Sequence, residues 1–410
     1  MTTPGAHNPT SPTTPAPLPL VLLITFLGSS GTAIVTNGIS FIAEQGLGYG
    51  ARMNLVLALV MGVVYTPAAF LSGAALRRLI KRSDRVTSRG FLIGLVTIEI
   101  LVCQLPILAQ RLAPDLIEPA LWVMALTFMI ATGLQWPIVE SYFSGGRREH
   151  ALRKAIGHFN ICWASAMVLS YWFMAPLLEH HPFVIVSVLG WVHVAVALIT
   201  LKLPAEPAKH LDTGAHPHPP IYETLLREFR VLIVASYVVI ATMSPMLPSI
   251  QGRLGIPTMW LTPIASTWLI VRVLMFGVFQ RYHFWHGKRS TPWIGLVSMI
   301  IGFTLTMLSP IASSIPLLVI GLIFTGIGIA IIYLGSLYYA LSVGSSDVDS
   351  GGMHEGLIGL GYTLGPLCGL VAGFSTRWEE GRQESVTVVL TVILVVLMLG
   401  IGLRLVRSPR

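Results

Sequence analysis

The sequence predicts an all-α polytopic membrane protein, with twelve transmembrane helices arranged as two six-helix pseudo-repeats. Three observations lead to this fold class. Hydrophobic residues make up 54% of the 410 residues and charged residues only 11%, against about 25% charged in a typical soluble domain. Apolar segments long enough to cross about 30 Å of hydrocarbon recur along the whole chain. Finally, Lys and Arg gather in alternate connections between these segments.

The predicted spans fall into two groups of six. Residues 1–17 contain Pro and Thr but no Lys or Arg, so we expect a disordered cytoplasmic tail and no signal peptide. A polar, Pro-containing stretch at 203–229 is interpreted as a cytoplasmic linker between the halves 18–202 and 230–405, and 406–410 as a cytoplasmic tail. The predicted spans are 18–42, 53–76, 90–110, 119–143, 155–178, 183–202, 230–250, 260–281, 292–312, 316–342, 354–375 and 385–405.

The basic residues predict the orientation. With the N-terminus inside, twenty of the 26 Lys and Arg residues fall on the cytoplasmic side, and Arg272 lies within a span. Only five lie outside: Arg52, Arg111, Arg253, Arg377 and Arg382. This asymmetry is a positive-inside signal. We therefore expect an integral protein of the plasma (inner) membrane with both termini in the cytoplasm.

Several function classes are disfavoured by composition and spacing. The net charge of +8 resides in short loops, which indicates membrane topology and no nucleic-acid partner. Cys103, Cys162 and Cys368 fall inside apolar stretches and form no disulfide or metal-ligand pattern. His354-Glu355 is not followed by a second His, because position 358 is Ile. We expect no cofactor, no metal and no enzymatic activity, with the lipid bilayer and a small molecule as partners of a functional monomer.

The two-half architecture resembles the major facilitator superfamily over roughly residues 18–405. The loop after the second span carries Gly73, Asp84-Arg85 and Arg89, which are similar to the Gly-x-x-x-Asp-Arg-x-Gly-Arg signature of that superfamily. The resemblance implies secondary transport of a small organic molecule by alternating access, with proton coupling as one option. Efflux of amphipathic compounds, nutrient (sugar-like) uptake and a non-transporting sensor on the same fold stay open as alternatives.

The loop between spans 10 and 11 is acidic although it is predicted to be cytoplasmic. It contains Asp347, Asp349 and Glu355 but no Lys or Arg between Gly344 and Glu355. Spans 2 and 11 are neighbours in the resembled fold, so the basic loop with Arg85 and Arg89 would face these acids. We interpret the pair of loops as an ionic latch that stabilises an outward-facing state. A purely topogenic basic loop is the alternative reading.

Small residues form a stripe along span 11. Gly361, Gly365, Gly369 and Gly373 recur at every fourth position and share one helix face, which lets another helix approach closely. With Gly352 and Pro366 the spacing also resembles the antiporter motif of the superfamily, which there belongs to span 5. Close helix packing and antiport are therefore both compatible with this stripe.

Ionisable residues inside spans are functional candidates because they are costly in a membrane. Glu140, at the end of span 4, and the His354-Glu355 pair are the candidates for proton coupling. Glu140 precedes Arg147 by seven residues, a spacing that resembles sugar porters, so structural pairing with Arg147 or Arg148 is the alternative. Arg272 needs an acid, an anionic substrate or carbonyl groups as its partner. Glu99 lies comparably deep, and His193 reads as a packed, hydrogen-bonded residue.

Polar and aromatic residues on the spans that line the cavity in the resembled fold predict a substrate site. Aromatic walls with few polar groups suit an amphipathic organic ligand. The predicted cavity residues are Asn37, Gln135, Trp136, Asn160, Trp163, Tyr237, Trp268, Arg272, Tyr338 and Tyr339.

Overall fold

The computed structural model describes residues 14–83, 85–147, 149–208, 219–343, 348–377 and 382–407. Every regular element in these ranges is helical, so the predicted all-α class is confirmed for the described chain. The helices are α1 (Leu18–Gly31), η1 (Thr32–Asn37), α2 (Ile39–Leu47), α3 (Ala51–Arg82), α4 (Ser88–Val102), α5 (Leu105–Leu112), η2 (Pro114–Leu116), α6 (Ile117–Ser144), α7 (Glu149–Leu178), α8 (Pro182–Thr200), α9 (Ile221–Arg253), α10 (Thr258–Ala265), α11 (Thr267–Arg281), α12 (Ser290–Leu308), α13 (Ile315–Val343), α14 (Val348–Ser375) and α15 (Arg382–Arg407).

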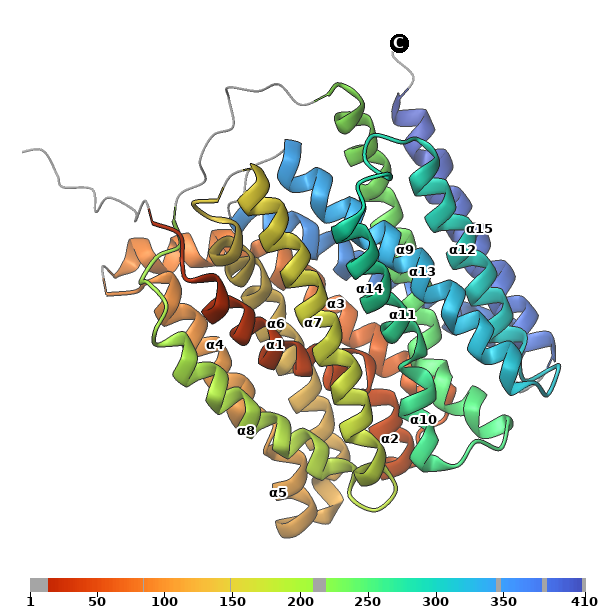
Figure 1. The fold of residues 1–410 in the computed structure, drawn as a ribbon. Coiled ribbons are helices and arrows are strands. Elements are labelled where there is room, and N and C mark those ends of the chain that lie inside the picture. The colour runs from red at the N-terminus through yellow and green to blue at the C-terminus, as the bar shows by residue number, and fades with distance from the viewer. Residues whose placement is uncertain are drawn as a thin grey trace, which may run out of the picture.

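Eleven helical stretches of the described chain are long and apolar enough to cross a membrane. In α15 the apolar stretch, Ser385–Gly400, is shorter, so the count of twelve crossings stays a prediction. Figure 1 shows the long helices running side by side, with α4, α5 and α8 at one flank of the bundle and α12 and α15 at the other. These helices make the chain an integral membrane protein.

Three predicted spans are interrupted, and the one at 90–110 is divided at Cys103 and Gln104 between α4 and α5. The span predicted at 18–42 is divided into α1, the π-helical turn η1 and α2. The side chain of Asn37 donates from Nδ2 to the Thr32 carbonyl oxygen at 3.0 Å and so closes this turn. The span predicted at 260–281 is divided at Ser266 between α10 and α11. Single π-helical turns are frequent at functional sites because they turn side chains out of the regular helical register.

The chain between the two predicted halves is more helical than the sequence indicated. Helix α9 begins at Ile221, so the amphipathic stretch before residue 230 continues into the span. Residues 201–208 pack against the first half. Tyr142 donates to the Pro204 carbonyl oxygen at 2.9 Å, and the backbone N–H of Arg89 donates to the Ala205 carbonyl oxygen at 3.1 Å.

Close helix contacts around α14 depend on glycine. A Cβ on Gly365 would meet the Val238 carbonyl oxygen and the Thr242 backbone nitrogen of α9, and one on Gly361 would meet Tyr237. On the opposite side, a Cβ on Gly62 of α3 would meet the backbone of Tyr362. Helix α14 is thus wedged between α3 and α9 at backbone contact distance.

Candidate functional site

A small cavity with aromatic walls and a few polar groups lies at the centre of the bundle. Its volume is about 50 Å³. Helices from both predicted halves line it with seven aromatic side chains, three threonine or serine hydroxyls near the η1 turn and one carboxylate. The lining residues are Ser29, Thr32, Thr36, Tyr65, Thr132, Trp136, Phe159, Trp163, Tyr237, Tyr333, Glu355, Ile358 and Tyr362. The volume holds one or two water molecules, so a larger ligand requires the surrounding helices to separate.

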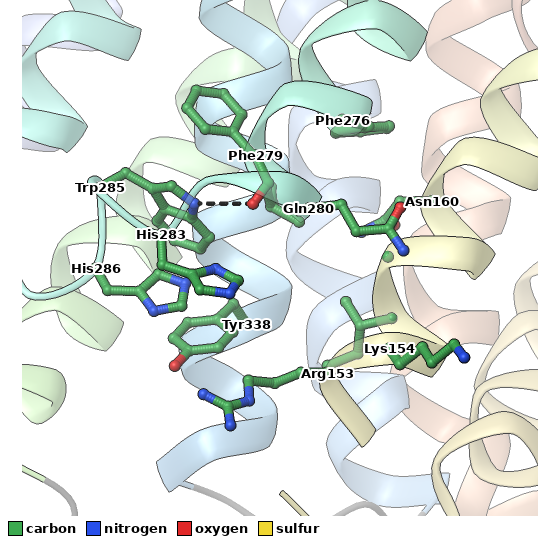
Figure 2. A pocket seen from close by; sticks show the side chains of 13 residues that line it. Arg153, Lys154, Asn160, Phe276, Phe279, Gln280, His283, Trp285, His286 and Tyr338 are labelled. Atoms are coloured by element: carbon green, nitrogen blue, oxygen red, sulfur yellow. Dashed lines mark hydrogen bonds between the residues drawn. The ribbon is translucent and has the colours of Figure 1, made fainter. Parts of the chain in front are cut away.

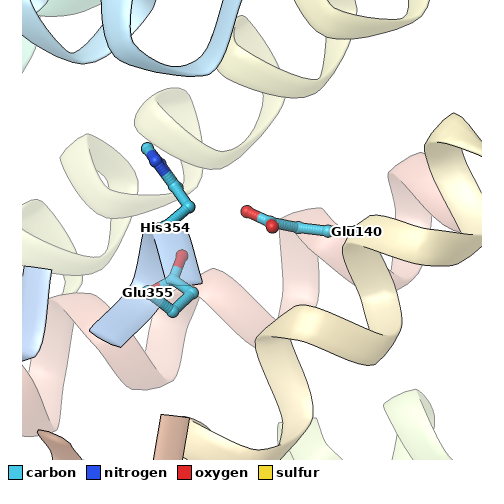
Figure 3. Close-up of side chains that lie close together, drawn as sticks. All are labelled: Glu140, His354 and Glu355. Atoms are coloured by element: carbon cyan, nitrogen blue, oxygen red, sulfur yellow. The ribbon is translucent and has the colours of Figure 1, made fainter. Parts of the chain in front are cut away.

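Two carboxylates and one imidazole meet beside this cavity. Glu140 of α6 lies opposite His354 and Glu355 of α14, and one ligand atom from each residue lies within 4.8 Å of the others. Figure 3 shows the Glu140 carboxylate directed toward this pair. The approach is close because residue 351 is glycine: a Cβ there would come within 2.8 Å of Glu140 Oε2. All three residues are buried.

The hydrogen bonds of this cluster connect it to the cavity wall. Tyr65 donates its hydroxyl to Glu355, and His354 Nδ1 lies 3.5 Å from the Ser336 hydroxyl. His354 Nε2 is buried with no hydrogen-bond partner among the described residues. A carboxylate–imidazole–carboxylate group of this kind can hold a metal ion or pass protons.

Arg272 occupies a cage of aromatic rings. Its side chain is 1% exposed, and its guanidinium carbon lies 4.3 Å from the Trp163 ring centre and 4.6 Å from that of Tyr333. Phe276 and Trp268 complete the cage at 5.4 and 6.0 Å. Each such contact stabilises a desolvated cation by about 2 kcal/mol or somewhat more, which is well below the cost of burying an unpaired charge.

A second, larger cavity lies beyond this cage, between α7, α11 and α13. Its volume is about 330 Å³. Figure 2 shows His283, His286 and Tyr338 on one side of this cavity and Asn160 on the other. The rings of His286 and Tyr338 are stacked at 4.4 Å. A hydrogen bond of 3.3 Å from Trp285 Nε1 to the Phe279 carbonyl oxygen holds the connection that carries the two histidines.

The larger cavity is basic. Arg153 and Lys154 stand at its exposed rim. His286 lies in the connection between α11 and α12, where burial, together with the nearby His283 and Arg153, lowers its pKa to about 4. Its ring is therefore uncharged at neutral pH and acts as an aromatic wall. The two rim side chains supply the positive charge.

A separate polar cluster lies within the first predicted half. Thr132 donates to Glu99 Oε1 at 2.9 Å, and Glu99 Oε2 lies 3.3 Å from His193 Nε2. The amide of Gln135, oriented with its nitrogen toward Glu99, donates at 3.0 and 3.2 Å. Gln135 therefore faces Glu99, and its neighbours Thr132 and Trp136 line the central cavity.

The other predicted cavity residues divide between several places. Trp136, Trp163 and Tyr237 line the central cavity, whereas Asn160 and Tyr338 line the larger one. Asn37 borders a third pocket of about 20 Å³. Trp268 belongs to the Arg272 cage. Tyr339 stacks on Phe229 at 5.5 Å and accepts a hydrogen bond from the Gly287 backbone.

Some cavity residues could not be selected from the sequence. Tyr65 lies on the second span, which is not expected to face the cavity, and Tyr333 and Tyr362 read as ordinary membrane aromatics. One usable signal exists for Tyr362: it follows Glu355 by seven residues, two helical turns later on the same face. Arg153, Lys154 and the two loop histidines read only as topogenic or interfacial residues.

The structure also shows where the charged ends of the spans lie. Arg77 of α3 pairs with Asp349 of α14, and both side chains are exposed. Arg89 donates instead to the carbonyl oxygens of Leu201 and Leu203. Asp84 and Asp347 lie outside the described residues.

The hypothesis that Glu140 pairs with Arg147 needs correction. Arg147 donates to the carbonyl oxygens of Tyr142 at 3.1 Å and Phe143 at 2.6 Å, and also to that of Ala16. Carbonyl groups at the end of α6 thus satisfy this guanidinium, and Glu140 points the other way, toward α14. Arg148, the alternative partner, lies outside the described residues.

Comparison with known proteins identifies the fold. No protein-family model matches the sequence, and no curated protein matches it. Among solved structures, the nucleoside transporter NupG is similar with a TM-score of 0.63 and 13% identity, over 96% of this chain and 99% of that one. A mutant of NupG gives a TM-score of 0.64. The human organic anion transporter MFSD10 is similar with a TM-score of 0.63 and 14% identity, over 93% of this chain and 98% of that one.

The chain is thus a polytopic membrane protein whose fold is similar to those of NupG and MFSD10 over nearly its whole length.

Proposed function

We propose that the chain is a major facilitator superfamily member that moves a small organic molecule across the membrane by alternating access. Residues 18–202 and 230–405 form the two six-helix halves in this proposal, and 203–229 and both termini are cytoplasmic. The observation that carries it is the buried cavity with Glu140 from one half and Glu355 from the other at its edge. A polar site between the two halves, at mid-bundle, is where substrate binds in transporters of this architecture.

Proton coupling is the part of the proposal that the Glu140–His354–Glu355 cluster supports. Two carboxylates this close, and shielded from water, repel each other when both are charged. A shared proton removes that repulsion, and its release changes the attraction between α6 and α14. Because these helices belong to different halves, the proton state biases the balance between the two access states.

The experiment uses purified protein in proteoliposomes that contain a pH-sensitive dye. Mixed pools of sugars, nucleosides, amino acids, organic anions and amphipathic cations are added outside, and an active pool is then split. We expect a substrate that moves protons with it. Glu140→Gln and Glu355→Gln should abolish this proton movement yet keep exchange of labelled substrate for unlabelled substrate. A chelator in all samples excludes a metal contribution at the same cluster.

The outcomes separate the alternatives. Full proton movement in both variants would show that these carboxylates do not couple transport. Exchange without proton movement in the wild type would indicate a facilitator. If no pool is moved but one raises the unfolding temperature of the protein, the sensor alternative is favoured. NupG and MFSD10 are named for different substrates, a nucleoside and an organic anion. The shared fold therefore does not define the substrate class, which depends on the residues of the site.

A further inference from the structure

Arg272 is a buried cation without a counterion. No carboxylate of the described residues lies within 4.0 Å of its guanidinium, and its Nε and Nη2 atoms have no hydrogen-bond partner there. The polar side chain near this guanidinium is that of Tyr237, which also lines the central cavity. Aromatic faces reduce the cost of this arrangement, but the N–H groups on these two nitrogens stay unsatisfied.

Asn160 presents a second buried donor nearby. Its side chain is fully buried. Its Oδ1 accepts from Trp163 Nε1 at 3.2 Å, which leaves Nδ2 directed away from that bond and without a partner among the described residues. Trp163 also carries the Arg272 guanidinium on its face. Asn160 and Arg272 are therefore joined through a single indole ring, and both present unused N–H groups.

The cavity beside Asn160 is basic and aromatic. Asn160 and Phe276 form the inner wall of the 330 Å³ cavity, and Arg153 and Lys154 stand at its exposed rim. Among the described residues that line this cavity there is no carboxylate. The stacked rings of His286 and Tyr338 make one wall of the cavity flat. The cavity therefore attracts negative charge at its rim, accepts an apolar ring in the middle and has Asn160 in its wall. Arg272 is not a lining residue, but its guanidinium lies 5.4 Å from the ring of Phe276, which is one.

We propose that the substrate is an organic anion with an aromatic or other flat apolar body. Its charged group is bound by Arg272 and Asn160, and the 330 Å³ cavity is its access site from the side that the basic loops assign to the cytoplasm. This inference rests on the proposed transport function and adds the substrate class. A guanidinium with free N–H groups forms charge-assisted hydrogen bonds to a carboxylate or phosphate, and such an anion supplies the missing counterion.

Binding is tested with three probes of one shape and different charge. Radiolabelled 2-naphthoate is measured by equilibrium dialysis against detergent-purified protein, with 2-naphthalenemethanol and 2-naphthylmethylamine as competitors. We expect saturable binding of the carboxylate and at least about tenfold weaker competition by the alcohol and the amine. Arg272→Gln and Asn160→Asp should each weaken naphthoate binding at least about tenfold. Lys154→Glu, at the exposed rim, should weaken it without affecting folding.

The control is Arg281→Gln, which removes a positive charge from an exposed residue of the same helix that does not itself line the cavity. It should leave binding unchanged. If Arg272→Gln does not fold, Asn160→Asp and Lys154→Glu still test the site. Equal competition by the amine, or unchanged binding in these two variants, overturns the proposal.

Two further arms separate other sources of negative charge. Inorganic phosphate competing as well as naphthoate would overturn the organic part of the proposal. Loss of naphthoate binding in phosphatidylglycerol nanodiscs, but not in phosphatidylcholine nanodiscs, would assign the cavity to a lipid headgroup and overturn the substrate assignment. Binding does not require transport. If naphthoate binds but is not moved across the membrane of proteoliposomes, the proposed transport function is contradicted and the anion site is not. If an amine is transported and the acid is not, the proposed anionic substrate is contradicted and the transport function is not.

Discussion

Glu99 shows how a carboxyl group is accommodated in the middle of this bundle. His193 Nδ1 lies 2.9 Å from the Leu189 carbonyl oxygen, which only accepts, so Nδ1 carries a proton. The other ring nitrogen faces Glu99 Oε2 at 3.3 Å, and one proton is shared between the two groups. Thr132 and Gln135 donate to the same carboxyl group. The cluster is thus a closed hydrogen-bond network, as expected for buried polar groups.

We predict that Glu99→Leu lowers the free energy of unfolding by about 1–3 kcal/mol, because it leaves buried donors and an acceptor unpaired. Glu99→Gln should cost less, since its carbonyl oxygen still accepts from Thr132 and its amide can donate to His193. Thermal unfolding in detergent measures both, with the exposed Glu179→Gln as the control. Equal losses in the two variants would contradict the network.

At the scale of elements, glycine decides how close α14 lies to its neighbours. Gly365 approaches the α9 backbone, whereas a Cβ on Gly277 of α11 would meet nothing within 4 Å. Neither residue has the left-handed backbone that favours glycine. The same chemical change should therefore have opposite effects at the two positions.

We predict that Gly365→Ala destabilises the protein by about 1–3 kcal/mol through overpacking. Gly277→Ala should stabilise it by about 0.5–1 kcal/mol, because alanine loses less backbone entropy in a helix. The two unfolding temperatures, compared with that of the wild type, measure the contrast. A stable Gly365→Ala protein would mean that α9 and α14 are not in backbone contact.

The ends of α3 and α14 form an exposed ionic contact. Arg77 and Asp349 pair there, close to Gly73, where a Cβ would meet the Asp349 carboxylate. An exposed pair contributes only about 0–1 kcal/mol. That is still enough to shift two access states of similar energy by severalfold.

We predict that Asp349→Lys raises the labelling of a cysteine at position 160 by an impermeant maleimide added from the cytoplasmic side. The increase should be about two- to fivefold, the range that up to about 1 kcal/mol allows. Restoring the pair in reverse, with Arg77→Asp and Asp349→Arg, should return labelling to the wild-type rate. Unchanged labelling in Asp349→Lys would argue against a latch.

At the scale of the whole molecule, contacts close both ends of the central cavity. At one end Ser249 of α9 donates to Glu44 of α2 at 3.3 Å, and Trp172 of α7 donates to Ser266 at 3.2 Å. At the other end α3 meets α14, whereas α7, α11 and α13 surround the 330 Å³ cavity. At this end of the bundle, α3 and α14 are therefore tightly packed, whereas α7, α11 and α13 are more loosely packed around the cavity.

We predict that this looser end faces the cytoplasm. A cysteine at position 83, after α3, should react with an impermeant maleimide only from the cytoplasmic side. A cysteine at position 312, after α12, should react only from outside. Labelling of intact cells and of inverted vesicles measures both. The reverse pattern would invert the predicted orientation and with it the side from which the anion enters.

The sequence alone determined that the chain is a helical membrane protein, because a composition with so few charges can be solvated only by lipid. It also singled out the buried candidates Glu140, Arg272 and Glu355, since ionisable groups are rare inside apolar spans. Only the tertiary structure decided their partners. Glu140 faces His354 from a helix more than two hundred residues away, and Arg272 sits among rings from three helices. Periodicity within one helix fixes a face, but the facing helix depends on the packing of the entire chain.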